Sequence, residues 1–263
     1  MDTLSGKDAP PRVELPNPLE SKLALYLPLG ASERALLSDI GGATLRFQRA
    51  AAIANEGVEQ THVYVVKSGW CSCARHLSDG RRQITRFALP GDFLCFDSIV
   101  AATSVQDIVA ITEVTLLQLK VETLGEIAAR APRLAVAILW AAAQDESALA
   151  ERLTSLGRRY ALERLSHLFV ETYCRLNALG LASDQRLFFP VTKEQLADAM
   201  GLTTIHIYRT LRRLTEDGLI ALEGSWLTIH DLEGLSDVAK FDSRYIQRSR
   251  MPDDTKRMLE QAF

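Results

Sequence analysis

The stretch VTKEQLADAMGLTTIHIYRTLRRL, Val191–Leu214, decides how the C-terminal part of this chain folds. Thr192 and Gln195 have the spacing of a capping box, which starts a helix. Gly201 is placed to end that helix, and the pair of threonines that follows can cap the next one. The turn between the two helices is so short that they must cross. The stretch therefore predicts a helix-turn-helix.

The second helix of this motif has two distinct faces. Ile207, Leu211 and Leu214 recur at helical spacing, so we expect them to be buried. The opposite face carries hydrogen-bonding and guanidinium side chains, the kinds that read base edges and phosphates in a DNA major groove. For His206, in the first turn, a phosphate contact and plain solvation both stay open. The predicted DNA-contacting residues are Thr203, Thr204, Ile205, His206, Tyr208, Arg209, Arg212 and Arg213.

Charge is distributed unevenly along the chain. The 263 residues carry 30 Lys and Arg against 33 Asp and Glu, a formal net charge of −3, so the whole chain is not a polycation that coats nucleic acid. Between Arg158 and Leu214, however, nine basic residues stand against five acidic ones. The sequence thus predicts a local nucleic-acid site in an otherwise acidic chain.

Upstream of the motif the pattern changes to short strands. Residues 43–119 hold apolar, β-branched runs such as His62–Lys67, separated by turn signals such as Asp79–Gly80 and Pro90–Asp92. Many short strands at this spacing are typical of a β-barrel or jelly roll. Downstream of the motif, Trp226–Ile229 and the residues before it predict a two-stranded wing.

The segment that starts at Pro132 reads as one long helix with an apolar stripe. Interspersed alanines would let a second helix approach it closely. The stripe either packs on its own domain or forms the seam of a dimer, and Asp145 on the stripe keeps that choice open. The stripe residues, taken as dimerisation candidates, are Leu134, Ile138, Ala142, Leu149, Leu153 and Leu156.

The order of these parts resembles the Crp/Fnr family of bacterial transcription regulators. The motifs that carry the resemblance are LTTIHIYRTL at Leu202–Leu211, Gly218–Ile220, VVKSG at Val65–Gly69 and Pro90–Phe93, and it covers roughly residues 20 to 240. The resemblance implies a homodimer joined through the central helix, with its recognition helices in successive major grooves of a palindromic DNA site. It also implies RNA polymerase as a partner.

By position, the resemblance gives Thr204, Ile205 and Arg209 the base-reading places of the recognition helix. Arg209 matches the family's arginine and suits bidentate contact with guanine. Ile205 departs from the glutamate that is common there, so the DNA sequence read is expected to differ.

We therefore expect an α+β chain with an N-terminal β-roll (jelly roll), a long central dimerisation helix and a C-terminal winged helix-turn-helix. The predicted parts are a disordered arm at 1–18, a β-roll domain at 19–131, the dimerisation helix at 132–157, the winged helix-turn-helix at 158–236 and an extension at 237–263. The sequence assigns no role to the extension.

A cyclic nucleotide is not expected in the β-roll. Cys95 and Phe96 stand where nucleotide-binding relatives have a Gly-Glu pair, and approximately Ser104 and Val105 stand where they have an Arg-Ser pair. Phe87–Leu119 contains no Lys or Arg, so a phosphodiester would meet carboxylates and no cation. We expect neither cyclic AMP nor cyclic GMP to bind.

The cysteines suggest other kinds of sensing. Relatives with an iron–sulfur cluster place several cysteines in an N-terminal arm, and Met1–Leu36 has none. A haem-bearing relative has Cys-x-His after the Pro-Gly-Asp turn, and Cys95–Asp97 lacks the histidine, so we expect no haem. Cys71 and Cys73 share one strand face, and a redox-active thiolate there is the alternative to simple core packing. The redox candidates are Cys71, Cys73 and Cys95, and we favour core packing for them.

Other classes of protein find little support. The longest apolar run, Leu134–Ala143, is well short of the ~20 residues that a membrane span needs, and no secretory signal is present, so we expect a cytoplasmic protein without a membrane partner. The histidines show no metal-ligand or catalytic spacing, and no enzyme motif occurs. We expect no metal site, no catalytic residue and no enzymatic activity.

These observations predict a sequence-specific transcription regulator that binds double-stranded DNA. One alternative is a redox- or haem-responsive regulator that senses through its cysteines. Another is a β-roll ligand-binding module whose C-terminal helices contact protein. Steep weakening of DNA binding between about 50 and 200 mM salt would distinguish a DNA-binding protein from the second alternative.

Overall fold

The computed structural model describes residues 14–40, 42–246 and 254. Contacts group these residues into two compact units. We call 14–71, 88–149 and 243–246 the β-roll unit, and 72–87 together with 150–242 the helix-turn-helix unit. The predicted domain 19–131 includes the hairpin at 72–87, which the contacts group with the helix-turn-helix.

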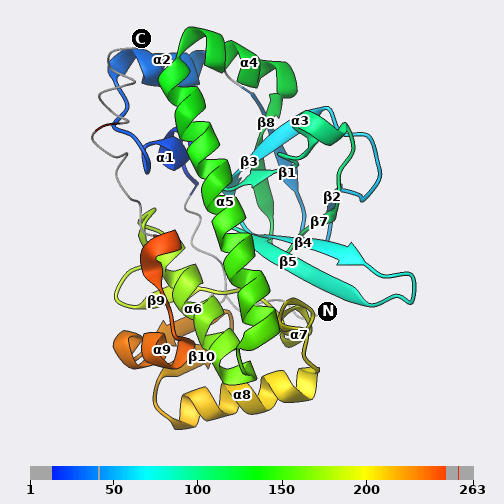
Figure 1. The fold of residues 1–263 in the computed structure, drawn as a ribbon, viewed down its shortest axis with the longest axis vertical. Helices are drawn as coiled ribbons and strands as arrows, with labels where there is room; N and C mark the ends of the chain where they lie inside the picture. The colour runs from blue at the N-terminus through cyan, green and yellow to red at the C-terminus, as the bar shows by residue number, and fades with distance from the viewer. Residues whose placement is uncertain (1–13, 41, 247–253, 255–263) are drawn as a thin grey trace. The chain divides into compact units, whose positions relative to one another are not determined.

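The β-roll unit combines short helices with antiparallel strands (Figure 1). One sheet has the strand order β1-β8-β3-β6, and β2 and β7 are antiparallel neighbours in a second sheet. The strands are β1 (Ala43–Phe47), β2 (Ala52–Ala54), β3 (His62–Ser68), β6 (Phe93–Leu94), β7 (Asp107–Ala110) and β8 (Val114–Lys120). The helices are α1 (Pro18–Leu23), α2 (Ala31–Asp39), α3 (Ser98–Ala101) and α4 (Val121–Arg130). This arrangement confirms the predicted β-roll.

The core of this unit joins its helices to the sheet. Leu19 and Leu23 of α1 pack in one cluster with Val63 and Val65 of β3 and with Phe93. The end of β3 also needs glycine, since Gly69 has φ +85° and an added Cβ would lie 2.2 Å from the carbonyl oxygen of Glu113. The glycine of the Val65–Gly69 motif is therefore needed because the turn after β3 passes close to the backbone just before β8.

The residues just before α1 are ordered, which corrects part of the predicted disordered arm. The Leu15 amide donates to the Lys67 carbonyl oxygen at 3.1 Å, and the Asn17 side chain accepts a hydrogen bond from the Glu20 amide as the cap of α1. Buried Leu15 explains why this segment is held. The rest of that arm, 1–13, lies outside the described residues, as do 247–253 and 255–263 of the predicted extension.

The long helix α5, Pro132–Arg158, runs through both units. In its first half, Leu134 and Ile138 belong to the β-roll core. These two residues pack within their own chain, which is the alternative to a dimer seam that the sequence analysis left open. Elsewhere on the helix, Leu139, Leu149 and Leu153 keep 68%, 49% and 73% of their surface exposed.

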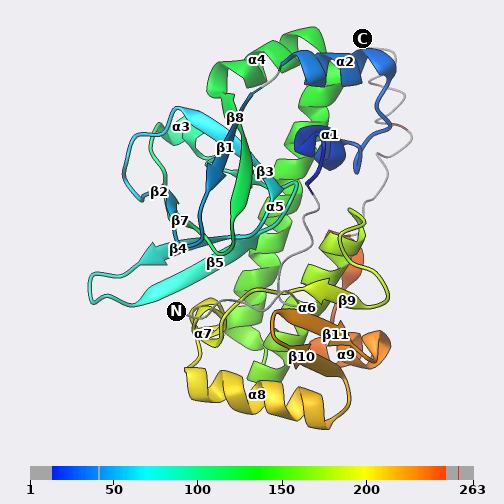
Figure 2. The ribbon, with the colours of Figure 1, turned by 180° about the vertical axis from the view of Figure 1, so that it is seen from behind.

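The helix-turn-helix unit contains a β-hairpin, a helical bundle and a small sheet (Figure 2). The hairpin consists of β4 (Cys71–His76) and β5 (Arg82–Ala88). The helices are α6 (Ala161–Asn177), α7 (Lys193–Met200), α8 (Thr204–Glu216) and α9 (Leu232–Ala239). The strands β9 (Arg186–Phe188), β10 (Ile220–Glu223) and β11 (Trp226–Ile229) form a sheet with the order β10-β11-β9.

The small sheet confirms the predicted wing and adds a strand to it. β10 pairs with β11 as expected, and β9 pairs with the other edge of β11. The Phe188 and Trp226 rings meet edge to face at 5.6 Å, and the Arg186 guanidinium lies 4.6 Å from the Trp226 ring centroid. The wing is thereby held to the segment before α7.

Candidate nucleic-acid interface

The α7–α8 motif has the local geometry that its sequence predicts. The Gln195 amide donates to Thr192 Oγ1 at 3.2 Å, and the Thr192 amide donates to Gln195 Oε1 at 2.9 Å, so the capping box is complete. Gly201 ends α7 in the left-handed conformation with φ +63°. Of the two threonines that follow, Thr203 caps α8, since its hydroxyl accepts from the His206 amide at 3.3 Å. These contacts fix the turn between the helices.

The two faces of α8 are separated as predicted. Ile207, Leu211 and Leu214 are buried, and so is Thr210, whose hydroxyl donates to the His206 carbonyl oxygen. The side chains available to a partner therefore lie on the outer face of α8. Exposed there or at its cap are all eight predicted contact residues: Thr203, Thr204, Ile205, His206, Tyr208, Arg209, Arg212 and Arg213.

The three arginines of α8 have different surroundings. The helix runs to Glu216, beyond the stretch used for prediction, and this brings two carboxylates within reach. Arg212 Nε donates to Glu216 Oε1 at 2.7 Å, and Arg213 Nε lies 3.6 Å from Asp217 Oδ2. Arg209 makes no hydrogen bond or ion pair to any residue in the described ranges. The positive charge of the face is thus least compensated at Arg209.

Lys193 adds a cation that the list of predicted contacts does not contain. It starts α7, and its Nζ lies 4.4 Å from the ring centroid of Tyr208 on α8. A cation over an aromatic face is attracted to the ring electrons. Both side chains are exposed, so the pair extends the outer face of α8 across to α7. Its signal in the sequence is a basic residue directly after the capping threonine.

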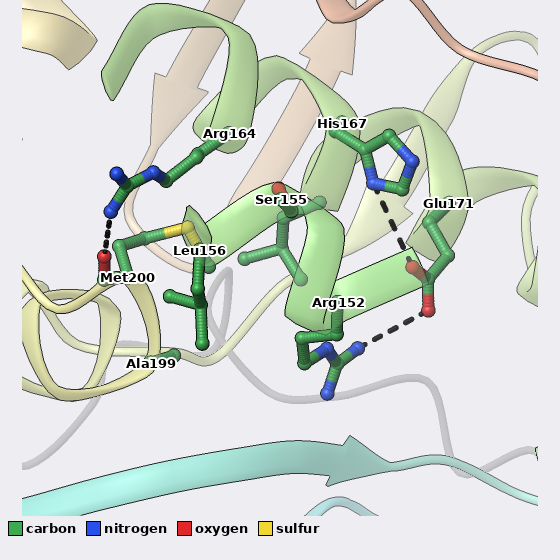
Figure 3. A pocket seen from close by; sticks show the side chains of 9 residues that line it. Arg152, Ser155, Leu156, Arg164, His167, Glu171, Ala199 and Met200 are labelled. Carbon is green, nitrogen blue, oxygen red and sulfur yellow. Dashed lines mark hydrogen bonds and ion pairs between the residues drawn. The ribbon is translucent and has the colours of Figure 1, made fainter. Parts of the chain in front are cut away.

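Arg164 on α6 holds the motif from inside. Its Nη1 donates to the Met200 carbonyl oxygen at 2.7 Å (Figure 3), and its Nε donates to the Arg159 carbonyl oxygen at 2.9 Å. Met200 O is one of the carbonyls at the end of α7 that the helix itself leaves unpaired. Arg164 therefore fixes the end of α7 and is not part of the exposed charge.

A cluster of charged side chains lies beside Arg164 in the interior of the unit. Arg152 Nη2 lies 3.3 Å from Glu171 Oε1, and His167 Nδ1 lies 3.8 Å from Glu171 Oε2 (Figure 3). His167 Nε2 also lies 3.3 Å from Glu151 Oε1, and Arg159 pairs with the same glutamate. Burial lowers the pKa of His167, and the neighbouring arginines offset the pull of the two carboxylates.

The cavity among these residues is small. Its free volume of about 10 Å³ is lined by Arg152, Leu156 and Met200 among others, and it has room for about one water molecule. The charged cluster is therefore a structural element of the unit and not a ligand pocket.

The predicted sensing residues of the β-roll are buried. Cys71 and Cys73 are fully buried, and Cys95 is 1% exposed. Lys22 Nζ lies 3.4 Å from Asp92 Oδ1, so the aspartate of the Pro-Gly-Asp turn is occupied by a cation of its own chain. Among the described residues no group of three or more His, Cys, Asp or Glu side chains is arranged to hold a metal ion. In the same residues no helix is long and apolar enough to cross a membrane.

The fold and the site define a class of protein: a winged helix-turn-helix DNA-binding domain joined to a β-roll. The family model of the cyclic nucleotide-binding domain matches residues 44–131, and that of the Crp-like helix-turn-helix domain matches residues 163–238.

Relatives and solved structures agree with this class. The chain is 32% identical over 180 residues to the nitrogen fixation regulation protein FixK of Azorhizobium caulinodans, covering 68% of this chain and 71% of that protein. It is 26% identical to the anaerobic regulatory protein of Haemophilus influenzae over 83% of this chain and 84% of that one. The structure of FixK2 from Bradyrhizobium japonicum has a TM-score of 0.67 at 24% identity and covers 75% of this chain and 96% of that chain.

The chain therefore belongs to the Crp/Fnr family of transcription regulators, as the sequence motifs predicted. The mixed architecture of a β-roll, a long helix and a C-terminal helix-turn-helix is the one that the sequence analysis expected.

Proposed function

We propose that the chain acts as a cytoplasmic homodimer that binds a palindromic DNA site through α8 and controls transcription there. The observation that carries this proposal is the outer face of α8, where every predicted contact residue is exposed above a buried apolar face. Side chains of these types, presented by a short crossed helix pair, suit the major groove. RNA polymerase is the partner that a transcription regulator would have to reach.

The exposed leucines of α5 support the homodimer. Leu139, Leu149 and Leu153 are large apolar side chains with exposed surface on one helix, and an exposed apolar patch marks an interaction surface. A second copy offers the same helix, so the patch can cover itself by two-fold symmetry. Leu149 and Leu153 remain candidates from the predicted stripe, while half-buried Leu156 lines the small cavity of its own unit.

Within α8 we assign base reading to Thr204, Ile205 and Arg209. Arg209 has no hydrogen bond or ion pair to another described residue, so its guanidinium can make the bidentate contact that guanine offers. Arg212 and Arg213 would exchange their exposed carboxylate partners for phosphates, because exposed ion pairs between residues four apart are weak.

We further propose that the β-roll does not respond to cyclic nucleotides. Asp92 is paired with Lys22, and Phe87–Leu119 supplies no cation for a phosphodiester. The buried thiols give redox sensing no exposed site among Cys71, Cys73 and Cys95, and haem is not proposed.

The test is selection of binding sites from random duplexes, followed by sedimentation of the free and the DNA-bound protein. We expect an inverted-repeat consensus with half-sites about 34 Å apart and a protein dimer. A selection that yields no consensus, or a monomer on DNA, would contradict the proposal. Calorimetric titration with cyclic AMP and cyclic GMP should give no binding, and a micromolar Kd would overturn that part alone.

A further inference from the structure

The β4–β5 hairpin differs in charge from the rest of the β-roll sequence. Residues 72–87 carry four arginines against one aspartate, whereas 14–71 and 88–149 together carry eight Lys and Arg against fourteen Asp and Glu. The tip of the hairpin, Arg75–Arg82, is exposed throughout. A basic, exposed element in an acidic surrounding is an electrostatic footprint for an anionic partner.

The hairpin is fixed to the end of α7 in the helix-turn-helix unit. Arg82 Nε and Nη2 both donate to Asp198 Oδ2, at 2.8 and 2.5 Å, and Gln83 Nε2 donates to the Ala199 carbonyl oxygen at 3.2 Å. At the base of the hairpin, the Thr85 carbonyl oxygen accepts from Arg152 Nη1. These contacts hold the tip at a defined place beside the motif that binds DNA.

A groove of about 690 Å³ lies between the hairpin and the α7–α8 turn. One wall is made by His76, Arg81 and Arg82, and the other by Asp198, Gly201 and Leu202. Arg82 anchors the hairpin to α7, whereas Arg81 on the same wall has its described ion pair within the tip, with Asp79 at 2.8 Å. The side chains of Arg81 and Asp79 are both more than half exposed.

The position of this groove indicates which anion it faces. In a helix-turn-helix bound to DNA, the first helix crosses the sugar-phosphate backbone while the second enters the groove. α7 is that first helix here, and the hairpin is bonded to its C-terminal end at Asp198 and Ala199. A strand of backbone that passes the turn at Gly201 would therefore run beside His76 and Arg81.

We propose that the β4–β5 hairpin is a second DNA-contacting element, in which Arg81 binds a phosphate of the DNA held by α8. This proposal rests on the proposed function of α8. Arg81 supplies an exposed guanidinium for phosphate oxygens. Because Arg81 would contact backbone, it adds affinity without adding sequence preference.

The test uses the full-length protein and the duplex obtained by site selection. Arg81→Gln should weaken binding to cognate and to scrambled duplexes by the same factor, several-fold. It should also lower the slope of log affinity against log salt concentration by about one for each subunit. Asp79→Asn should do the opposite, since it removes the carboxylate that competes for Arg81 while keeping an oxygen for the Arg81 amide. Arg75→Gln is the matched control, because Arg75 is exposed on the same hairpin but does not line the groove.

Methylphosphonate scanning decides whether the partner is a phosphate. In wild type, neutralising one backbone position opposite the hairpin should weaken binding, and in Arg81→Gln the same replacement should have no further effect. If every methylphosphonate reduces the DNA affinity of Arg81→Gln as much as that of wild type, the hairpin does not contact DNA and the proposal fails. In that case, binding of wild type to the duplex would still support the proposed function of α8. Arg81→Gln protein that binds DNA normally but fails in transcription would overturn the proposal in favour of a protein partner. Absence of any DNA binding by wild type would overturn both.

Discussion

The arginines of the helix-turn-helix unit fall into two groups that the sequence does not distinguish. Arg152, Arg159 and Arg164 point inward, where they bond carboxylates and helix-end carbonyls. Arg209, Arg212 and Arg213 are exposed on α8. Counting basic residues along the sequence therefore overestimates the positive charge that DNA can contact. Buried guanidiniums stabilise the fold, and only the exposed ones attract phosphate.

The largest effect is expected from an inward arginine. Arg152→Met should reduce the free energy of unfolding by about 3 kcal/mol, because Glu171, whose side chain is only 5% exposed, would lose one of its cationic partners. Urea unfolding followed by circular dichroism measures this. The control is Arg212→Met at a side chain that is 73% exposed, where we expect no resolvable change in the free energy of unfolding. Equal stability losses at both positions would erase the distinction between the two groups.

The next effect concerns Arg209, the outward arginine that pairs with no side chain in the part of the chain that the structure describes. Arg209→Ala should lose about 1–3 kcal/mol of discrimination between cognate and scrambled duplexes, since a bidentate guanine contact is removed. Its unfolding free energy should stay close to that of wild type because the side chain is exposed. Competition binding with both duplexes measures the ratio of affinities. A ratio unchanged from wild type would remove Arg209 from the base-reading residues.

A smaller effect tests the inward group through pH. Because the folded-state pKa of His167 lies below its ordinary value of 6.5, the unfolded chain binds a proton more readily than the folded one. The free energy of unfolding should therefore fall as pH drops below about 6.5. His167→Gln should flatten this part of the pH profile. An equally steep decline in the variant would show that another group is responsible.

The smallest effects are expected at the C-terminal end of α8. Arg212→Ala and Arg213→Ala should each weaken cognate and scrambled duplexes evenly, by a few-fold, and should lower the salt slope by about one for each subunit. The reason is that each guanidinium must give up its carboxylate partner before it binds a phosphate. The net gain in binding free energy is therefore smaller than for a cation that gives up no partner. Loss of discrimination in either variant would move it into the base-reading group with Arg209.

Local features of the site could be predicted from the sequence, while long-range contacts could not. The capping box at Thr192 and the buried face of Ile207 depend on residues a few positions apart, and both are as expected. The helix α8 runs to Glu216, beyond the stretch Val191–Leu214 that carried the prediction, so the charge predicted for its outer face did not include the Glu216 carboxylate.

The long helix shows the same limit. Periodicity places Leu134 and Leu153 on one stripe, but only the fold shows that the first packs in the β-roll core and the second stays exposed. The inward position of Arg164 likewise depends on Met200, 36 residues away. Pattern gives the face of a helix, and the surrounding fold decides what covers it.

The bond between Arg82 and Asp198 joins positions that are 116 residues apart. At the usual pace of synthesis, α7 would leave the ribosome about 6 to 20 seconds after the hairpin that it binds. During this time the hairpin lacks its partner on α7, and its arginines are solvated. A fragment that begins at α6 would lack this hairpin altogether, so excising the C-terminal region alone yields a helix-turn-helix with one side of α7 uncovered.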